Sequence, residues 1–278
     1  MVARPSVRGT ARWRAPAAPK LPASLDLTAA GDLTIGDEAR FERLGLGDLD
    51  LSGRSADGVE FSRCRLVRTD LSGSRLEAAR FTDCVFESTN LANLRTERSS
   101  MLRVRVPTAR MTGLQWVNGT LRDVTISDSR LDLSSWRFTT FSSVAFEGCN
   151  LTRADFQNAD LRGARFTDCD LTGAQFSQAS MDGTRFARCD LTGIGGVTSM
   201  TGAILAHHDT ARYERSTSNR RRTALSAKVW QAAHTCSIVR PAGPASAKAF
   251  RMASSMSTLP ESSIMLPEVR ARTECTCR

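Results

Sequence analysis

The chain has 278 residues, 41% of them hydrophobic and 24% charged, and its 38 Lys and Arg against 29 Asp and Glu give a net charge of +9. No stretch reaches the roughly 18 apolar residues of a membrane-spanning helix, so no membrane partner is expected. The basic excess would favour nucleic acid only if it lay on a folded surface. It does not, because residues 1–40, 41–205 and 206–278 carry net charges of +2, 0 and +7.

Residues 1–24 are assigned to a disordered N-terminal arm. Their start, MVARPSVRGTARWRAPAAPK, is positively charged but lacks the apolar segment of a secretory signal peptide, so a cytoplasmic location is the default expectation. Residues 25–40 follow as an irregular N-terminal cap, in which four apolar residues flank Gly31-Asp32: Leu25, Leu27, Leu33 and Ile35.

From Phe41 to Leu191 every fifth residue is apolar. Of these 31 positions, 29 hold large apolar residues, and the exceptions are Ala56 and Thr96. A period of five fits neither a helix nor a strand. It does fit a square coil in which each pentapeptide forms one side, because twenty residues then complete a turn and residue i stacks on residue i+20 about 4.8 Å away.

Residue types also sort with a period of twenty, as such a coil requires. One side has Leu or Met at every coil from Leu51 to Leu191, and another has consecutive aromatic residues from Trp116 to Phe176. The predicted structural core therefore includes Leu51, Leu71, Leu91, Phe141, Leu151, Phe156, Leu161, Phe166, Leu171, Phe176, Phe186 and Leu191.

The position two before each central residue should point into the narrow space near a corner and be small. Five cysteines occupy it and are predicted to be buried thiols that pack as small hydrophobic groups: Cys64, Cys84, Cys149, Cys169 and Cys189. The last three would stack within disulfide range, but a reducing cytoplasm should keep them as thiols. Larger residues break the rule between Leu94 and Val124, and with Pro107 they predict irregular coils in the middle.

The chain resembles the pentapeptide repeat family, whose motif is Ala-(Asp/Asn)-Leu-X-X with Leu or Phe at the centre. Matches include Ala154-Asp155-Phe156, Ala159-Asp160-Leu161 and Cys169-Asp170-Leu171-Thr172-Gly173. The resemblance covers about residues 41–205 and implies an all-β, right-handed quadrilateral β-helix of about 7–8 coils. The twenty-residue sorting leads to the same coil independently.

No pattern indicates catalysis, a cofactor or a metal. The three histidines, His207, His208 and His234, lie outside the repeats, and no glycine-rich phosphate loop is present. Cys275-Thr-Cys277 with Cys236 lacks the spacing of zinc ligands. Stacked Asp and Asn residues before the Leu column could form a carboxylate pair, but hydrogen bonds to turn backbone explain them better. We therefore predict that the chain is not an enzyme.

A candidate surface stripe leans basic and is broken by Asp83 and Asp123: Arg43, Arg63, Arg65, Arg103, Arg105, Arg165 and Arg185. Nucleic acid is disfavoured as its partner because the aromatic side chains point inward and cannot stack on bases. For some family members the resemblance implies inhibition of DNA gyrase by mimicry of duplex DNA, which protects against quinolones. Twenty acids and twenty bases in residues 41–205 do not match the charge of DNA. The leading hypothesis is a non-catalytic protein-interaction scaffold of unknown partner, with gyrase inhibition as the alternative.

Residues 206–278 are basic and lose the repeat. They are predicted to be either a disordered extension or an out-of-frame translation of a lost cap. Family members commonly end in a hydrophobic helix that mediates dimers, and this tail does not resemble it. A homodimer is left open but disfavoured.

Overall fold

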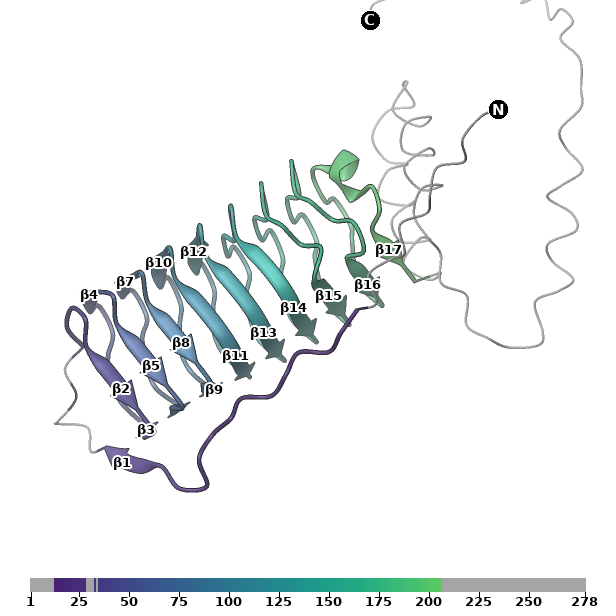
Figure 1. Ribbon diagram of the computed structural model, residues 1–278. Coiled ribbons are helices and arrows are strands. Elements are labelled where there is room, and N and C mark those ends of the chain that lie inside the picture. The colour runs from purple at the N-terminus through teal and green to yellow at the C-terminus, as the bar shows by residue number, and fades with distance from the viewer. Residues whose placement is uncertain (1–12, 29–32, 34, 207–278) are drawn as a thin grey trace, which may run out of the picture. The chain divides into compact units, whose positions relative to one another are not determined.

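The computed structural model describes residues 13–28, 33 and 35–206, and in this part of the chain short parallel strands stack into a four-sided solenoid (Figure 1). From β2 to β16, each strand pairs with a strand whose residues lie twenty positions away, so that Phe61 lies opposite Phe81. This is the coil length that the sequence predicts, and the all-β quadrilateral helix is confirmed.

The four sides are numbered by their central residues. Side 1 carries the column from Phe41 to Met181, side 2 that from Leu46 to Phe186, side 3 that from Leu51 to Leu191, and side 4 that from Ala56 to Phe176. Side 1 contains the strands β2 (Arg40–Glu42), β5 (Glu60–Ser62) and β8 (Arg80–Thr82). Three strands run across sides 1 and 2: β11 (Ser100–Pro107), β13 (Thr120–Ser127) and β14 (Thr140–Glu147).

The remaining strands belong to sides 2 and 4. Side 2 contains β1 (Asp26–Thr28), β3 (Leu44–Gly47), β6 (Arg65–Val67), β9 (Val85–Glu87), β15 (Ala164–Thr167), β16 (Arg185–Ala187) and β17 (Ile204–Leu205). Side 4 contains β4 (Ser55–Asp57), β7 (Arg75–Glu77), β10 (Arg95–Glu97) and β12 (Gln115–Val117). Side 3 is joined by isolated parallel bridges, from Asp50↔Asp70 to Asp170↔Asp190.

The chain turns at a corner two residues after each central residue. From Arg43 to Gly193, every residue at this position except Gly163 has a positive φ, between +47° and +78°. This left-handed conformation turns the backbone sharply, and it disfavours bulky side chains. The first corner lies between sides 1 and 2, the second between sides 2 and 3, the third between sides 3 and 4, and the fourth between side 4 and the next side 1.

The central residues fill the interior. All of the predicted core residues are buried, with exposed fractions of 0–3%. Aromatic rings stack face to face along three sides. On side 1, Phe41, Phe61 and Phe81 have centroids 4.8 and 5.4 Å apart. On side 2, those of Phe146, Phe166 and Phe186 are 4.9 and 5.0 Å apart, and on side 4 those of Phe156 and Phe176 are 5.3 Å apart. Each coil thus covers the apolar face of the one before it, which is how solenoid repeats stabilise one another.

The small inward residues have a polar role that the sequence analysis missed. Thr69, Ser74 and Thr184 donate hydrogen bonds to the carbonyl oxygens of Leu46, Leu51 and Leu161, at 3.1, 3.0 and 2.7 Å. Cysteines occupy the same place, as the contact from Sγ of Cys64 to the carbonyl oxygen of Phe41 at 3.3 Å shows. The donor lies 23 residues after its acceptor each time, so this column both fills the corner and joins neighbouring coils.

The expectation of irregular middle coils is wrong. The longest strands, β11, β13 and β14, lie there, and Val104, Val124 and Val144 pair in register and are fully buried. Valine is β-branched and favours an extended backbone, so the strand continues without a break at the inward position. Pro107 is the last residue of β11 and still accepts a hydrogen bond from the N–H of Ser88 at 3.1 Å.

The N-terminal segment also differs from the expectation of disorder. Residues 13–25, termed the strap, run extended along the solenoid and lead into β1, which pairs with β3 (Figure 1). At the other end, the 3₁₀ helix η1 (Val197–Met200) precedes β17, which pairs with β16. The expectations for residues 1–12 and for the tail beyond residue 206 lie outside the described residues.

Candidate interaction surfaces

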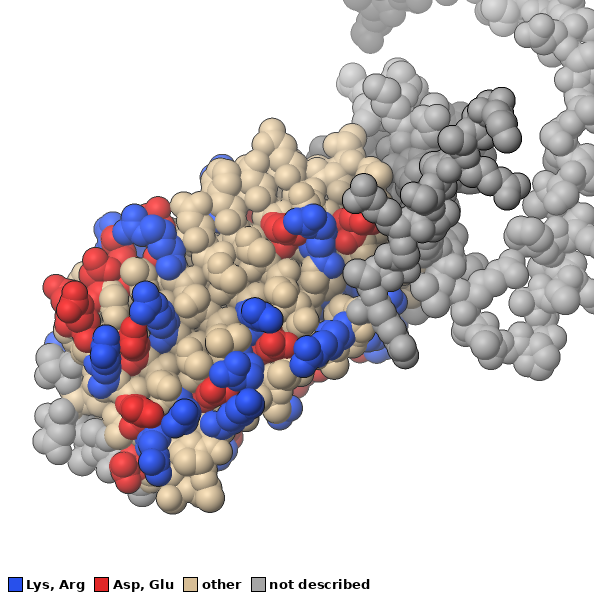
Figure 2. Space-filling view, in the orientation of Figure 1, with Lys and Arg blue, Asp and Glu red and all other residues tan. Residues whose placement is uncertain are grey.

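The predicted arginine stripe follows the first corner and the adjacent edge of side 2, where ion pairs interrupt it. Arg63 approaches Glu42 at 3.4 Å and Arg65 binds Glu87 at 2.5 Å. Figure 2 shows blue and red side chains interspersed, with a broad uncharged area across the middle of the same view. The stripe therefore presents no continuous cationic path.

Arg103 makes the least exposed of these pairs, with Asp83 of the first corner. Its Nε and a terminal nitrogen donate hydrogen bonds to the two carboxylate oxygens at 2.6 and 2.8 Å, and the Asp83 side chain is only 7% exposed. These hydrogen bonds hold the pKa of Asp83 below its ordinary value, helped by the backbone N–H of Lys20. Asp48 and Arg68 form the same pair at the second corner, where both side chains are exposed.

The strap lies over this part of the stripe. The N–H of Lys20 donates to Oδ1 of Asp83 at 2.9 Å, and the N–H of Ala17 donates to Oδ1 of Asp123 at 3.1 Å. Further along, the guanidinium carbon of Arg165 lies 5.0 Å from the ring centroid of Trp13, which is cation–π distance. Two acids that appeared to interrupt the stripe are therefore the acceptors for a second segment of the chain.

Two apolar side chains stand exposed at corners, and sequence analysis missed them. Leu133 at the third corner is 54% exposed and Phe138 at the fourth is 50% exposed, with φ of +58° and +57°. No other corner residue from Arg43 to Gly193 is a large apolar residue. Comparing the corner positions with one another would have revealed both residues.

Side 4 between these corners presents Ser135 and Arg137 outward. The Arg137 guanidinium lies 5.9 Å from the centroid of the Phe138 ring and 3.8 Å from the carboxylate of Asp155. Trp136 lies beneath, fully buried, and its indole N–H donates to Ser134 at 2.8 Å. The result is an apolar pair with polar groups around it on a rigid backbone.

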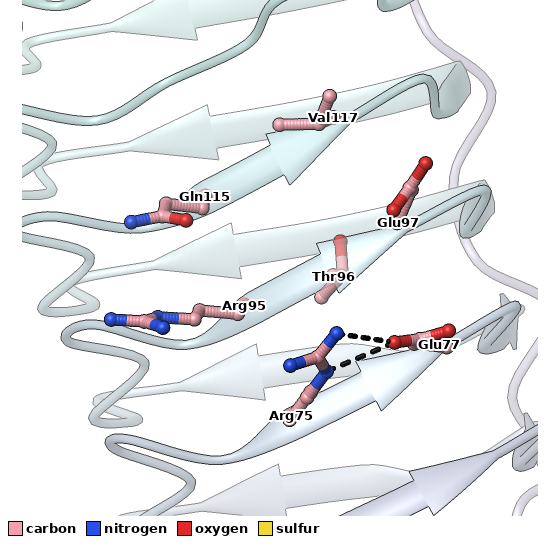
Figure 3. A pocket seen from close by; sticks show the side chains of 7 residues that line it. All are labelled: Arg75, Glu77, Arg95, Thr96, Glu97, Gln115 and Val117. Carbon is pink, nitrogen blue, oxygen red and sulfur yellow. Dashed lines mark hydrogen bonds and ion pairs between the residues drawn. The ribbon is translucent and has the colours of Figure 1, made fainter.

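A hollow of about 260 Å³ lies on side 4 in the earlier coils (Figure 3). It is lined by Arg75, Glu77, Arg95, Thr96, Glu97, Gln115 and Val117. Arg75 binds Glu77, two residues later on the same strand, at 2.8 Å, and Figure 3 shows that the basic and acidic side chains come from opposite ends of β7 and β10. The hollow thus contains both charges side by side but neither a His nor a Cys.

The Asp and Asn residues before the Leu column bind turn backbone. Asp50, Asp70, Asn150, Asp170 and Asp190 each accept a hydrogen bond from the N–H two residues later, at 2.7–3.0 Å. This is an Asx-turn arrangement, which stabilises a tight turn. These Asp and Asn side chains are therefore engaged in the turns of side 3, as their residue types predict.

The five repeat cysteines are buried free thiols. Hydrogen bonding to Cys149, together with burial, raises the pKa of Cys169 to about 12. Within the described residues no three His, Cys, Asp or Glu side chains are grouped to hold a metal ion. The histidines and the Cys275–Cys277 segment lie outside the described residues. In the described part no helix is long and apolar enough to cross a membrane.

Comparisons with known proteins agree on the repeat. Residues 137–207 match the model of a pentapeptide repeat region, and residues 46–83 match the model of pentapeptide repeats in eight copies. No curated protein matches the chain.

Several solved structures are similar at low identity. QnrB1, described as a plasmid-mediated fluoroquinolone resistance protein, is 18% identical with a TM-score of 0.29, covering 69% of this chain and 96% of its own. HetL, involved in heterocyst differentiation regulation in the cyanobacterium Nostoc sp. strain PCC 7120, is 17% identical with a TM-score of 0.24, covering 60% and 85%. Rfr23 from the cyanobacterium Cyanothece 51142 is 13% identical with a TM-score of 0.16, covering 57% and 88%. The two family models, the five-residue period and the four-sided coil together show that the solenoid of this chain is built from pentapeptide repeats.

Proposed function

We propose that the solenoid is a non-catalytic scaffold that binds another protein through side 4 of its fifth coil, residues 121–140. The observation that carries this proposal is the exposure of Leu133 and Phe138 at two consecutive corners. A reducing compartment such as the cytoplasm suits the buried thiols.

Folding alone does not account for these two residues. A bulky side chain in the left-handed conformation costs about 1 kcal/mol, and the exposed Leu133 and Phe138 recover little of it by burial. Equivalent corners in the next coil hold Arg153 and Asn158 with the same φ of +58°. The turn therefore does not require an apolar residue at these two positions. A partner that buries Leu133 and Phe138 would explain why they are apolar.

The chemistry of the surrounding surface indicates a protein partner. Protein interfaces typically combine a few buried apolar or aromatic anchors with a polar rim. Here Phe138 and Leu133 supply the anchors, while Arg137, Asp155 and Ser135 supply the rim. Because the solenoid backbone is already fixed, little conformational entropy is lost when the partner binds.

The experiment compares capture of host proteins by the full chain and by the variant Leu133→Asn/Phe138→Asn. Asparagine tolerates a positive φ, so this variant should fold. We expect a partner that the wild-type chain enriches to be lost at least about tenfold, since each anchor contributes about 1 kcal/mol or more. Arg153→Asn, at the third corner one coil later, is the matched control and should capture the partner normally. Equal capture by all three proteins would contradict the proposal.

The alternative function is inhibition of DNA gyrase as a DNA mimic. Duplex DNA carries one negative charge per about 1.7 Å, whereas residues 41–205 are neutral overall. Addition of excess protein to a supercoiling assay should therefore leave the activity of gyrase unchanged, and inhibition would favour the alternative.

A further inference from the structure

The strap has the features of a polyproline II helix. Its sequence places Pro16, Pro19 and Pro22 at every third residue, which is the repeat of polyproline II. The three prolines are half-buried, while Ala15 and Ala18 are exposed. No residue between 13 and 25 belongs to a strand. One ridge of the strap thus carries prolines against the solenoid, and another faces solvent.

The spacing of the strap matches the spacing of the coils. Ala17 and Lys20, whose N–H groups bind Asp123 and Asp83, are three residues apart, which is one polyproline II turn of about 9.3 Å. Asp83 and Asp123 are forty residues apart, which is two coils at about 4.8 Å, or about 9.6 Å. Consequently one turn of the strap spans two coils, and successive turns present their N–H groups to equivalent corners.

Recognition of the strap uses two backbone N–H groups, which any such helix possesses, and one aromatic side chain. Asp83 and Asp123 accept backbone N–H groups, and Arg165 lies against an aromatic ring. Arg103 fixes the Asp83 carboxylate by two hydrogen bonds, so the acceptor is oriented before a ligand arrives. Polyproline II segments lose little entropy on binding because they are already extended.

The strap itself lies outside the folded core. All central residues from Phe41 to Leu191 are buried within the stack of coils, and the strap adds no strand to it before β1. Its contacts here are two backbone hydrogen bonds, proline packing and one cation–π contact. A segment held in this way can be exchanged without unfolding the solenoid.

We propose that the first corner from Asp83 to Asp123, together with Arg165 on the adjacent edge of side 2, is a binding surface for proline-rich segments of other proteins, with prolines at every third residue, and that the strap occupies this surface and competes with them. The surface is separate from Leu133 and Phe138, and the proposal does not rest on the function assigned to them.

The test uses a fluorescent peptide with the sequence of residues 12–24 and the full-length chain. In the strap variant Pro16→Gly/Pro19→Gly, we expect trypsin to cleave the Lys20–Leu21 bond at least about tenfold faster than in wild type, because glycine loses the polyproline II bias. Fluorescence anisotropy should show saturable binding of one peptide to this variant and at least about tenfold weaker binding to the wild-type chain, in which the strap occupies the binding surface.

Further substitutions in the strap variant locate the binding site. Asp83→Ala, or Asp123→Ala if the first does not fold, should weaken peptide binding about tenfold or more through loss of a charged acceptor. Asp48→Ala removes the equivalent arginine pair at the second corner and should leave binding unchanged, and a peptide with Gly in place of its prolines should bind about tenfold less well. Persistent trypsin protection of the strap variant, absence of saturable binding, or binding insensitive to Asp83 and Asp123 would each overturn the proposal.

Discussion

Trp116 and Gly119 share one corner, and the indole occupies the space that a side chain at Gly119 would need. A Cβ added to Gly119 would collide with Nε1 of Trp116 and lie 2.9 Å from the carbonyl oxygen of Ser99. Gly119 does not have a positive φ, so its role is to leave room for the indole. Large and small residues in successive positions of one coil thus complement each other.

Gly119→Ala should therefore lower the free energy of unfolding by about 1–3 kcal/mol through overpacking. Gly47→Ala is the matched control, because a Cβ there meets nothing within 4 Å, and its effect should be small. Urea unfolding followed by circular dichroism measures both. If Trp116→Leu does not relieve part of the Gly119→Ala effect, the indole is not the cause.

Leu133 and Phe138, the exposed corner residues, should lower the free energy of unfolding. Replacing Leu133 by Asn should raise the free energy of unfolding by about 0.5–1 kcal/mol, because Asn accepts the left-handed conformation more readily. The reverse change, Asn158→Leu at the fourth corner one coil after Phe138, should lower it by a similar amount. Thermal unfolding of the two variants measures the difference, and a loss of stability in Leu133→Asn would show that the leucine serves the fold.

The stability of the folded chain should depend on pH through Asp83, because Arg103 and the strap both bind its ionised carboxylate. Because its pKa in the folded chain is lowered from 3.8, the ionised form stabilises the fold fully above the ordinary pKa, and this contribution is lost as pH falls below 3.8 through the lowered value. The stability difference between wild type and Asp83→Asn should thus be constant above about pH 5 and shrink on acidification. Urea unfolding between pH 2 and 7 measures it, and a difference that grows in acid would contradict this assignment.

The repeat cysteines should resist alkylation in the folded chain. Cys64, Cys84, Cys149, Cys169 and Cys189 are buried, so the reagent cannot reach their sulfur atoms, and the pKa of Cys169, raised to about 12, makes its thiolate scarce as well. Mass spectrometry after iodoacetamide treatment at pH 8 should find these five unmodified in buffer and modified in guanidinium chloride. Fast reaction of Cys169 under native conditions would indicate that its coil opens.

The fold could be predicted because its determinants are local and repeated. A large residue at every fifth position, from Phe41 to Leu191, fixes both the coil and its core. The middle coils were misjudged because Val104 was assessed by size alone, although its β-branched shape suits an extended strand. The spacing of Pro16 and Pro19 was visible in the sequence, but their position beside Asp83 and Asp123 depends on tertiary structure.

The candidate surfaces were harder to predict for a different reason. Exposed residues are not constrained by the repeat, so Leu133 and Phe138 stand out only after the corner positions are known to require a positive φ. The charged residues near the first corner could be grouped from the sequence. The sequence does not show that Arg103 pairs with Asp83, so that this arginine adds no free positive charge to the surface.

The twenty-residue register of the coils determines which deletions the solenoid can accommodate. Removing residues 61–80 would place Phe81 on Phe41 and keep every column intact, whereas removing five residues would rotate all later sides by a quarter of a turn. The strap adds a second constraint, because Lys20 and Ala17 bind Asp83 and Asp123, which must stay two coils apart. Shortening by one coil between Asp83 and Asp123 would leave the solenoid in phase with itself but out of phase with its own N-terminus.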